Sequence, residues 1–134
     1  MLLRWGLAIV LVMHGLGHAM FAMAAWTQID VGFTTSPWML PGAVMPDSLM
    51  GQIAAVVWLL ALVGFLIAAV GLVTNAAWWP GYAVGAAVLS LAVLVLWWNT
   101  ITPGSRVWAA IVDVAVLFAL LGPWKARVFE IIAQ

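Results

Sequence analysis

The chain contains no cysteine and very few charged residues, and each deficit restricts what the protein can be. Lys and Arg number 4 and Asp and Glu number 4 among 134 residues, so that charged residues make up 6% of the chain. A soluble domain carries about a quarter. So few charges cannot cover a water-exposed surface, which excludes a soluble enzyme. The lack of a basic patch excludes a nucleic-acid binder. Without cysteine there is no disulfide and no thiolate nucleophile or metal ligand.

Hydrophobic residues, in contrast, make up 68% of the chain, and they are arranged in long apolar runs. Four runs are long enough to cross a hydrocarbon core of about 30 Å as helices. The predicted helices span about residues 2–26, 48–73, 80–98 and 103–122, and a short interfacial helix over 123–133 follows. The sequence therefore predicts an all-α polytopic membrane protein. It forms one transmembrane domain over 1–134, an up-and-down four-helix bundle with a long outer loop between the first two helices.

The N-terminal run also resembles a secretory signal, because Arg4 precedes an apolar stretch that ends in the small-residue pattern Ala22-Met23-Ala24. His14 and His18 interrupt the second half of this stretch. A signal peptide needs an unbroken apolar core, so we interpret the run as a transmembrane helix.

Basic residues predict the orientation of the bundle. If the N-terminus lies inside, Arg4, Lys125 and Arg127 are cytoplasmic and only Arg106 lies outside. Cytoplasmic loops carry the excess of Lys and Arg, so both termini are expected in the cytoplasm. The protein is then expected in a bacterial cytoplasmic membrane, with the long loop over 27–52 outside. This loop contains the helix-capping candidates Asp47 and Ser48 and is expected to fold over the outer end of the bundle.

Two other features predict packing and depth. Gly81-x-x-x-Gly85 is a small-residue pair that favours close approach of the third helix to a neighbour. Indole rings prefer the headgroup level of a membrane. The tryptophans at predicted helix ends are Trp5, Trp26, Trp78, Trp79, Trp97, Trp98, Trp108 and Trp124. They serve as rulers for the depth of the polar residues between them.

Polar side chains within the predicted helices are few, and each needs a physical reason. His14 and His18 share one face of the first helix, since they are four residues apart. Counting from the outer tryptophans puts His18 and Ser90 about 12 Å, and Asp113 about 8 Å, below the outer interface, with His14 one turn deeper. A carboxylate and an imidazole stabilise each other in a low dielectric, so we expect Asp113 to contact His18 or His14. Arg106, two turns above Asp113, is a competing partner.

These residues allow several kinds of site. The catalytic candidates for proton transfer are His14, His18 and Asp113, and the cofactor-binding candidates are His14, His18 and Ser90. The two histidines are also metal candidates, because a pair at i, i+4 suits one small metal ion. The pair cannot supply opposite axial ligands to one haem, although each imidazole alone could ligate a haem or a chlorophyll-type pigment. Hydrogen bonds that merely join helices are the alternative for all of them.

The first helix also carries a resemblance. Its apolar run ends in His14-Gly15, a long outer loop with Gly and Pro follows, and the next helix is rich in Leu, Gly and Ala. With the Leu-Leu-Gly122-Pro123 ending, this arrangement resembles the DoxX-like family of small four-helix membrane proteins. The resemblance implies a membrane subunit associated with an oxidoreductase or electron-transfer system, in some members linked to quinone reduction.

The chain departs from the family pattern, since it lacks the acidic residue common in the second helix and adds His18 and Asp113. Three functions follow as hypotheses. The first is the oxidoreductase-associated subunit, with a quinone site at the histidines and an electron donor on a partner protein. The second is a non-catalytic accessory subunit, or a lipid- or pigment-binding subunit, of a larger membrane complex. The third is a small proton-coupled transporter. The expected partners are the lipid bilayer and either other membrane-protein subunits or further copies of the chain.

Overall fold

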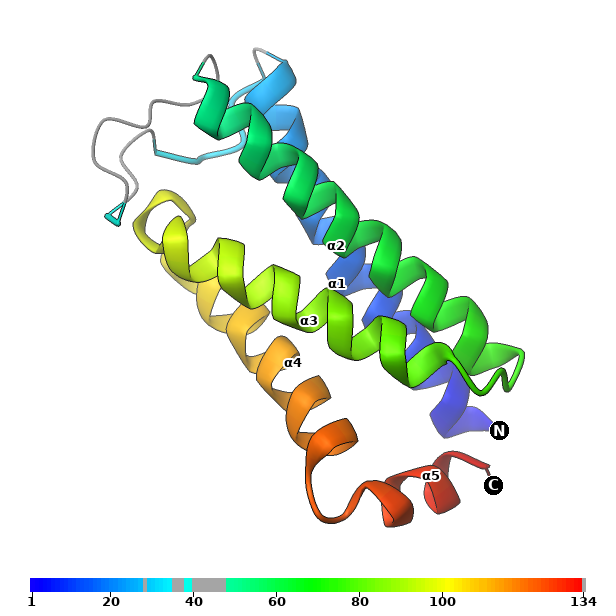
Figure 1. Ribbon diagram of the computed structural model, residues 1–134. Coiled ribbons are helices and arrows are strands. Elements are labelled where there is room, and N and C mark those ends of the chain that lie inside the picture. Colours follow the sequence, from blue (N-terminus) through cyan, green and yellow to red (C-terminus); the bar gives the residue numbers. More distant parts are fainter. Residues whose placement is uncertain (28, 35–37, 40–47, 134) are drawn as a thin grey trace.

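The computed structural model describes residues 1–27, 29–34, 38–39 and 48–133, and these ranges are helical with short connections. The helices are α1 (Leu2–Trp26), α2 (Leu49–Val73), α3 (Trp79–Leu96), the 3-10 turn η1 (Trp98–Thr100), α4 (Pro103–Leu121) and α5 (Lys125–Ala133). Helices α1 to α4 run up and down, and α5 turns back beneath them (Figure 1). All four are long and apolar enough to cross a membrane. The predicted four-helix membrane bundle is confirmed.

Local chemistry accounts for the helix ends. Ser48 caps α2, where its Oγ accepts a hydrogen bond of 3.0 Å from the Gly51 N–H. The other predicted cap, Asp47, lies outside the described residues, as does much of the 27–52 loop. α4 begins with Pro103 at its first position, which suits the fixed φ of proline. α3 ends at Leu96 rather than at the expected residue 98, because the chain tightens into η1 before it turns toward α4.

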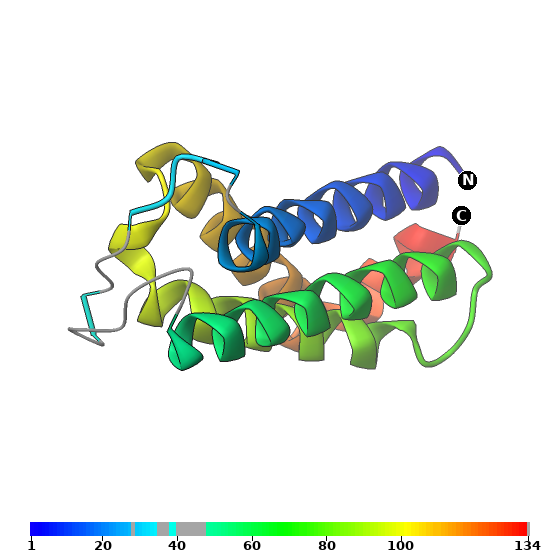
Figure 2. The ribbon, with the colours of Figure 1, turned by 90° about the horizontal axis from the view of Figure 1, so that it is seen from above.

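We call the end of the bundle that holds η1 and residues 29–34 the loop end, and the opposite end the terminal end. At the loop end, the Thr34 N–H donates to the Thr100 carbonyl at 2.9 Å, and the Trp38 indole N–H donates to the Val95 carbonyl. At the terminal end, the Arg4 guanidinium donates to the Ile132 carbonyl of α5 at 3.3 Å. α5 therefore lies beside the first turns of α1 (Figure 1 and Figure 2). The described part of the loop covers one end, and α5 covers the other.

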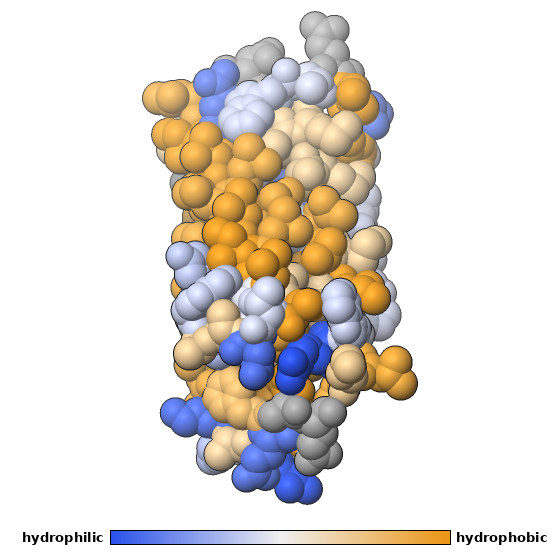
Figure 3. Space-filling model, turned by 90° about the vertical axis from the view of Figure 1, so that its right-hand side faces the viewer, coloured by the Kyte–Doolittle hydropathy of each residue, from blue (hydrophilic) through white to orange (hydrophobic). Residues whose placement is uncertain are grey.

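The outside of the bundle is apolar, as a lipid-facing surface requires. A belt of hydrophobic residues crosses the middle of the face in Figure 3, and hydrophilic residues gather toward its ends. Exposed side chains along the spans include Ile9, Leu60, Val88 and Phe118. Because lipid chains are as apolar as a protein core, these residues need no further partner. The structure thus supports an integral membrane protein.

Two apolar clusters form the core, one toward each end. The cluster at the terminal end contains Leu11, Phe65, Leu72 and Trp79, and the cluster at the loop end contains Phe21, Trp58 and Trp97, each with further buried alanines. Trp79 and Trp97 are thus core residues rather than the interfacial anchors that the sequence predicts, since they are only 9% and 3% exposed. Their indoles turn inward because α3 packs between α2 and α4.

Close helix contacts depend on glycines other than the predicted pair. A Cβ on Gly64 would lie 2.9 Å from the Cβ of Ala86, so α2 and α3 approach closely there. A Cβ on Gly81 or Gly85 would meet nothing within 4 Å. The prediction that Gly81 and Gly85 pack against a neighbouring helix is therefore wrong. α3 turns Ala83, Ala86, Ala87 and Ser90 toward the core, which leaves these two glycines on its outer face.

A matched pair of substitutions tests this packing. Gly64→Leu is expected to lower the free energy of unfolding by about 1–3 kcal/mol, the usual cost of overpacking, because Ala86 cannot withdraw from a new side chain. Gly85→Leu makes the same chemical change on the open face and is expected to leave stability unchanged. Unfolding in detergent micelles, followed by circular dichroism, measures both. Equal losses for the two variants would contradict the helix packing described above.

Candidate functional site

A buried carboxylate joins three of the membrane-spanning helices. Asp113 of α4 is 0% exposed. Its Oδ1 lies 2.7 Å from His14 Nε2 of α1, and its Oδ2 accepts a hydrogen bond of 2.5 Å from Ser90 Oγ of α3. The predicted contact between Asp113 and a histidine is confirmed, with His14 as the partner. Both carboxylate oxygens are engaged, which satisfies a group that would otherwise be costly in hydrocarbon.

The depth of this network differs from the sequence estimate by about one helical turn. His14, rather than His18, lies level with Asp113 and Ser90. The depth of Asp113 was underestimated because it was counted from Trp108. This tryptophan does not mark the start of α4 but lies inside it, five residues beyond its first residue, Pro103, and is 69% exposed. Counted from that first residue, Asp113 lies about 15 Å along the helix instead of about 8 Å.

Arg106 is the second correction, because it does not pair with Asp113. Its Nη1 donates to the Trp98 carbonyl at 2.9 Å, and its guanidinium carbon lies 5.1 Å from the centre of the Trp98 ring. The side chain thus reaches toward the loop end of the bundle, where a charged head belongs. Asp113 lies two helical turns deeper, and its carboxylate contacts His14 and Ser90 instead.

His18 adds a different feature to the site, an imidazole whose Nε2 has no hydrogen-bond partner among the described residues. The side chain is 4% exposed. Its ring packs edge-on against Trp58 and His14, with ring centres 5.1 Å and 4.9 Å away. Within the described part of the chain, neither His18 Nε2 nor Trp58 Nε1 has a hydrogen-bond partner. An unpaired buried polar atom costs about 1–3 kcal/mol. Trp97 Nε1, Thr100 Oγ1 and Arg106 Nε also lack a partner among the described residues, but His18 and Trp58 are the two that line the space described next.

Beside these residues lies a groove of about 460 Å³, which we call the α1–α4 groove. His14 and His18 line it from α1, Trp58 from α2, and Thr102 with Ser105 from the start of α4. α4 leaves this space because it packs on α3 and α5 and buries only Asp113 and Leu120.

The rim of the α1–α4 groove carries side chains that face the surroundings of the bundle. Ile9, Met13 and Trp108 line it, and their exposed fractions are 60%, 63% and 69%. The groove therefore opens sideways, toward the hydrocarbon of a bilayer. A molecule dissolved in the membrane could enter it without passing through water.

The groove fits some candidate groups better than others. A haem or chlorophyll-type macrocycle needs open space around its ligating nitrogen, whereas His18 Nε2 is fully covered and His14 Nε2 is bonded to Asp113. A small metal ion shared by both imidazoles would have to displace the same Asp113 bond. Among the described residues, no three His, Cys, Asp or Glu side chains are arranged to hold a metal ion. A quinone carbonyl needs room for one oxygen atom and a single donor, and its ring suits aromatic walls.

Most of these residues were predicted as site residues from the sequence, but the sequence did not show which of them form hydrogen bonds with one another. His14, Asp113 and Ser90 form one network, whereas His18 lies outside it with Trp58. Trp58 was missed as a site residue, although it is the one tryptophan in the middle of an apolar run rather than at its end. In comparisons with protein-family models, curated proteins and solved structures, nothing matches this chain.

Proposed function

We propose that this protein is a DoxX-like membrane subunit associated with an oxidoreductase or electron-transfer system, and that it binds a quinone head group in the α1–α4 groove. The observation that carries the proposal is a pair of covered, unpartnered polar atoms, His18 Nε2 and Trp58 Nε1, on two residues that line that groove. The Trp58 N–H is a donor, and His18 Nε2 is a donor in the matching tautomer. Each can bond a carbonyl oxygen after a small movement of the covering side chains.

A quinone accepts electrons and protons together when it is reduced. In this proposal a redox centre on a partner protein delivers the electrons, and this chain holds the head group and supplies protons. The residues placed to handle a proton are His14 and Asp113, whose bond lies one helical turn from His18. The imidazole and carboxylate can exchange a proton along this 2.7 Å contact without exposing either group to lipid.

A non-catalytic role is the second candidate. The His14–Asp113–Ser90 network is complete in itself and joins α1, α3 and α4, which is what a purely structural clasp would do. The chain would then be an accessory or lipid-binding subunit of a larger membrane complex. The unpartnered atoms of His18 and Trp58 favour the quinone site, because a network that only joins helices does not involve these two residues.

Loss of the two donors tests the quinone site. His18→Phe and Trp58→Phe keep an aromatic ring but remove the polar nitrogen, and each is expected to weaken binding of a short-chain benzoquinone about tenfold, the equivalent of one hydrogen bond. Trp78→Phe, a matched change at an exposed residue on another face, is the control. Equilibrium binding of the radiolabelled quinone to protein in detergent micelles measures all three. Unchanged binding in both site variants would overturn the proposed site.

Purification in mild detergent tests the wider function. A subunit that carries a redox centre is expected to copurify with the chain and to reduce an added quinone. A Soret or chlorophyll band on the isolated chain would point instead to a pigment-binding subunit. Copurification with a complex that turns over equally well without this chain would favour the accessory role.

We further propose that the chain lies in a bacterial cytoplasmic membrane with both termini in the cytoplasm. The basic residues Arg4, Lys125 and Arg127 all belong to the terminal end of the bundle, and Asp30 belongs to the loop end. An excess of Lys and Arg marks the cytoplasmic side.

Single cysteines test this orientation directly, since the natural chain has none. A cysteine at Asp30 is expected to react with an impermeant maleimide applied to intact cells. A cysteine at Lys125 is expected to react only after the membrane is opened. The reverse pattern would show that the bundle has the opposite orientation, and labelling of both from one side would contradict the number of crossings.

A further inference from the structure

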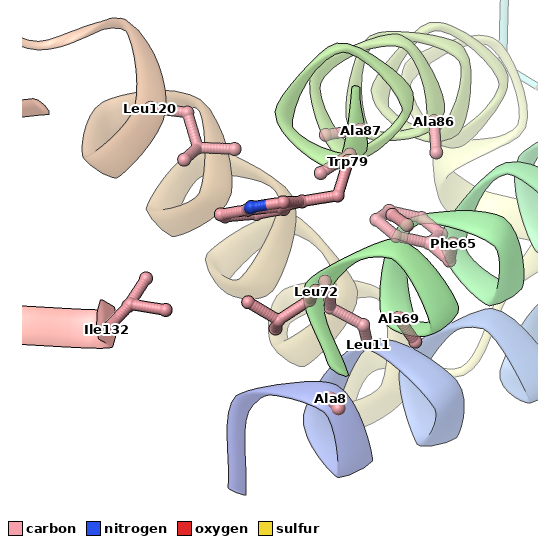
Figure 4. Packing of buried hydrophobic residues seen from close by; sticks show 12 residues of the cluster. Ala8, Leu11, Phe65, Ala69, Leu72, Trp79, Ala86, Ala87, Leu120 and Ile132 are labelled. Carbon is pink, nitrogen blue, oxygen red and sulfur yellow. The ribbon is translucent and has the colours of Figure 1, made fainter. Parts of the chain in front are cut away.

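A second hollow, of about 320 Å³, lies toward the terminal end of the bundle and is lined by all five α-helices. We call it the terminal hollow. Its walls are apolar and include Leu11, Leu72, Ala83 and Ala119. Figure 4 shows the Trp79 indole projecting between Leu72 and Leu120, with Ile132 of α5 at the side. No part of its lining offers a charged or hydrogen-bonding side chain other than this indole.

The terminal hollow and the α1–α4 groove follow the same seam. Val10 of α1 and Val112 of α4 line both of them. Along α4 the lining runs from Ser105 to Leu120, a distance of about 22 Å at 1.5 Å per residue. The two spaces therefore adjoin at Val10 and Val112 and form one track along α1 and α4, whose polar lining lies in the α1–α4 groove apart from the Trp79 indole. α5 closes the track at its far end through Val128 and Ile132.

The dimensions of this track select its occupant. A helix from another subunit has a diameter of about 10–12 Å with its side chains. The terminal hollow, at about 320 Å³, is too small to hold one. A single hydrocarbon chain needs no polar partners and is thin enough to lie between α1 and α4. Small side chains at Ala83 and Ala119 keep the space open, and an occupant would regain the dispersion contacts that an empty apolar hollow loses.

We propose that the terminal hollow binds the isoprenoid chain of the ligand whose head group lies at His18, so that the site is specific for long-chain membrane quinones. The identity of the head group rests on the proposed function above. The chain would lie inside the protein rather than in the surrounding lipid. Ala119 and Ala83 are then specificity-determining residues, because larger side chains there would exclude the chain without touching the head group.

The test distinguishes binding of the isoprenoid chain from binding of the quinone head group. Binding is measured in detergent micelles for a benzoquinone without a chain and for the same ring carrying an isoprenoid chain. Ala119→Phe is expected to weaken binding of the long-chain quinone about tenfold relative to wild type, with binding of the chainless quinone unchanged. Ala92→Phe makes the same change on the exposed face of α3 and should alter neither. Comparing variants at one ligand removes the effect of partition into micelles. Equal loss for both quinones, or for neither, would overturn the proposal.

Photocrosslinking distinguishes failure of the chain site from failure of the quinone site. A long-chain quinone and a fatty acid, each with a diazirine near the chain end, are irradiated with the protein, and the modified peptides are identified by mass spectrometry. Labelling of α4 near Ala119 by the quinone, but not by the fatty acid, is the expected result. Labelling by both shows a general lipid-chain site and overturns the specificity. If neither quinone binds but the fatty acid labels the hollow, the proposed function fails while the hollow still holds a chain. Quinone binding without labelling there overturns the chain site alone.

Discussion

Asp113→Leu is expected to destabilise the bundle more than any other substitution proposed for this protein. The change removes the acceptor of Ser90 Oγ and the partner of His14 Nε2 together and leaves both buried. Breaking a buried pair costs about 3–5 kcal/mol in soluble proteins, whereas a polar contact between membrane helices averages nearer 1 kcal/mol. Because two contacts are lost at once, we expect a loss of about 2–4 kcal/mol in the free energy of unfolding. Reversible unfolding in mixed detergent micelles measures it.

Two comparisons show whether the loss of stability in Asp113→Leu comes from the contacts of Asp113 with His14 and Ser90. Asp30→Leu removes a carboxylate outside the membrane-spanning helices, where its Oδ1 accepts a hydrogen bond from the Gly32 N–H, and should cost much less. In a double-mutant cycle, His14→Leu combined with Asp113→Leu should cost less than the sum of the single changes, since the double variant leaves no unpaired imidazole. Additive costs would mean that the 2.7 Å contact carries no coupling energy.

The helices themselves could be predicted closely from the sequence. The first residue and the last residue of α1 agree with the prediction, and α2, α4 and α5 begin or end within about two residues of it. Length alone separates a membrane span from a core helix, and Ser48, Pro80 and Pro103 mark where the helices start. These signals are local, so they can be read from the sequence without knowing which helices pack against one another.

The faces of the helices could not be predicted in the same way. In a soluble helix an apolar stripe marks the buried side, but a helix that is apolar all round carries no such stripe. For this reason nothing in the sequence showed that Gly64, and not Gly85, meets a neighbouring helix. The gap between α1 and α4 was equally hidden, because its lining residues are as apolar as those that face lipid.

Polar residues were the exception, since each one in hydrocarbon needs a partner on another helix. That requirement alone paired Asp113 with a histidine. It could not choose between His14 and His18, because they share one face and differ by one turn. The choice depends on the offset of α4 along α1, which is set by how the helices pack against one another. The sequence does not encode that offset in any local pattern.

Asp113→Asn is expected to separate the structural role of the network from a role in proton transfer. A carboxamide has nearly the shape of the carboxylate. Its oxygen can accept from Ser90, and its NH₂ group can donate to the other tautomer of His14. The fold should therefore survive, with a change in the free energy of unfolding of no more than about 1 kcal/mol. The amide cannot, however, take up and release a proton as a carboxylate does.

If the network delivers protons to a quinone, the loss of proton transfer at residue 113 lowers the rate of quinone reduction without affecting folding or binding. In the complex purified with its electron-donor subunit, Asp113→Asn is expected to slow quinone reduction at least about 100-fold, the lower range for a lost general acid or base. Asp30→Asn, the same change in the loop, should leave the rate unchanged. Quinone binding to Asp113→Asn should remain near wild type, because His18 and Trp58 hold the head group. A variant that folds, binds and still turns over at the normal rate would make Asp113 a clasp between helices and leave proton delivery to another route.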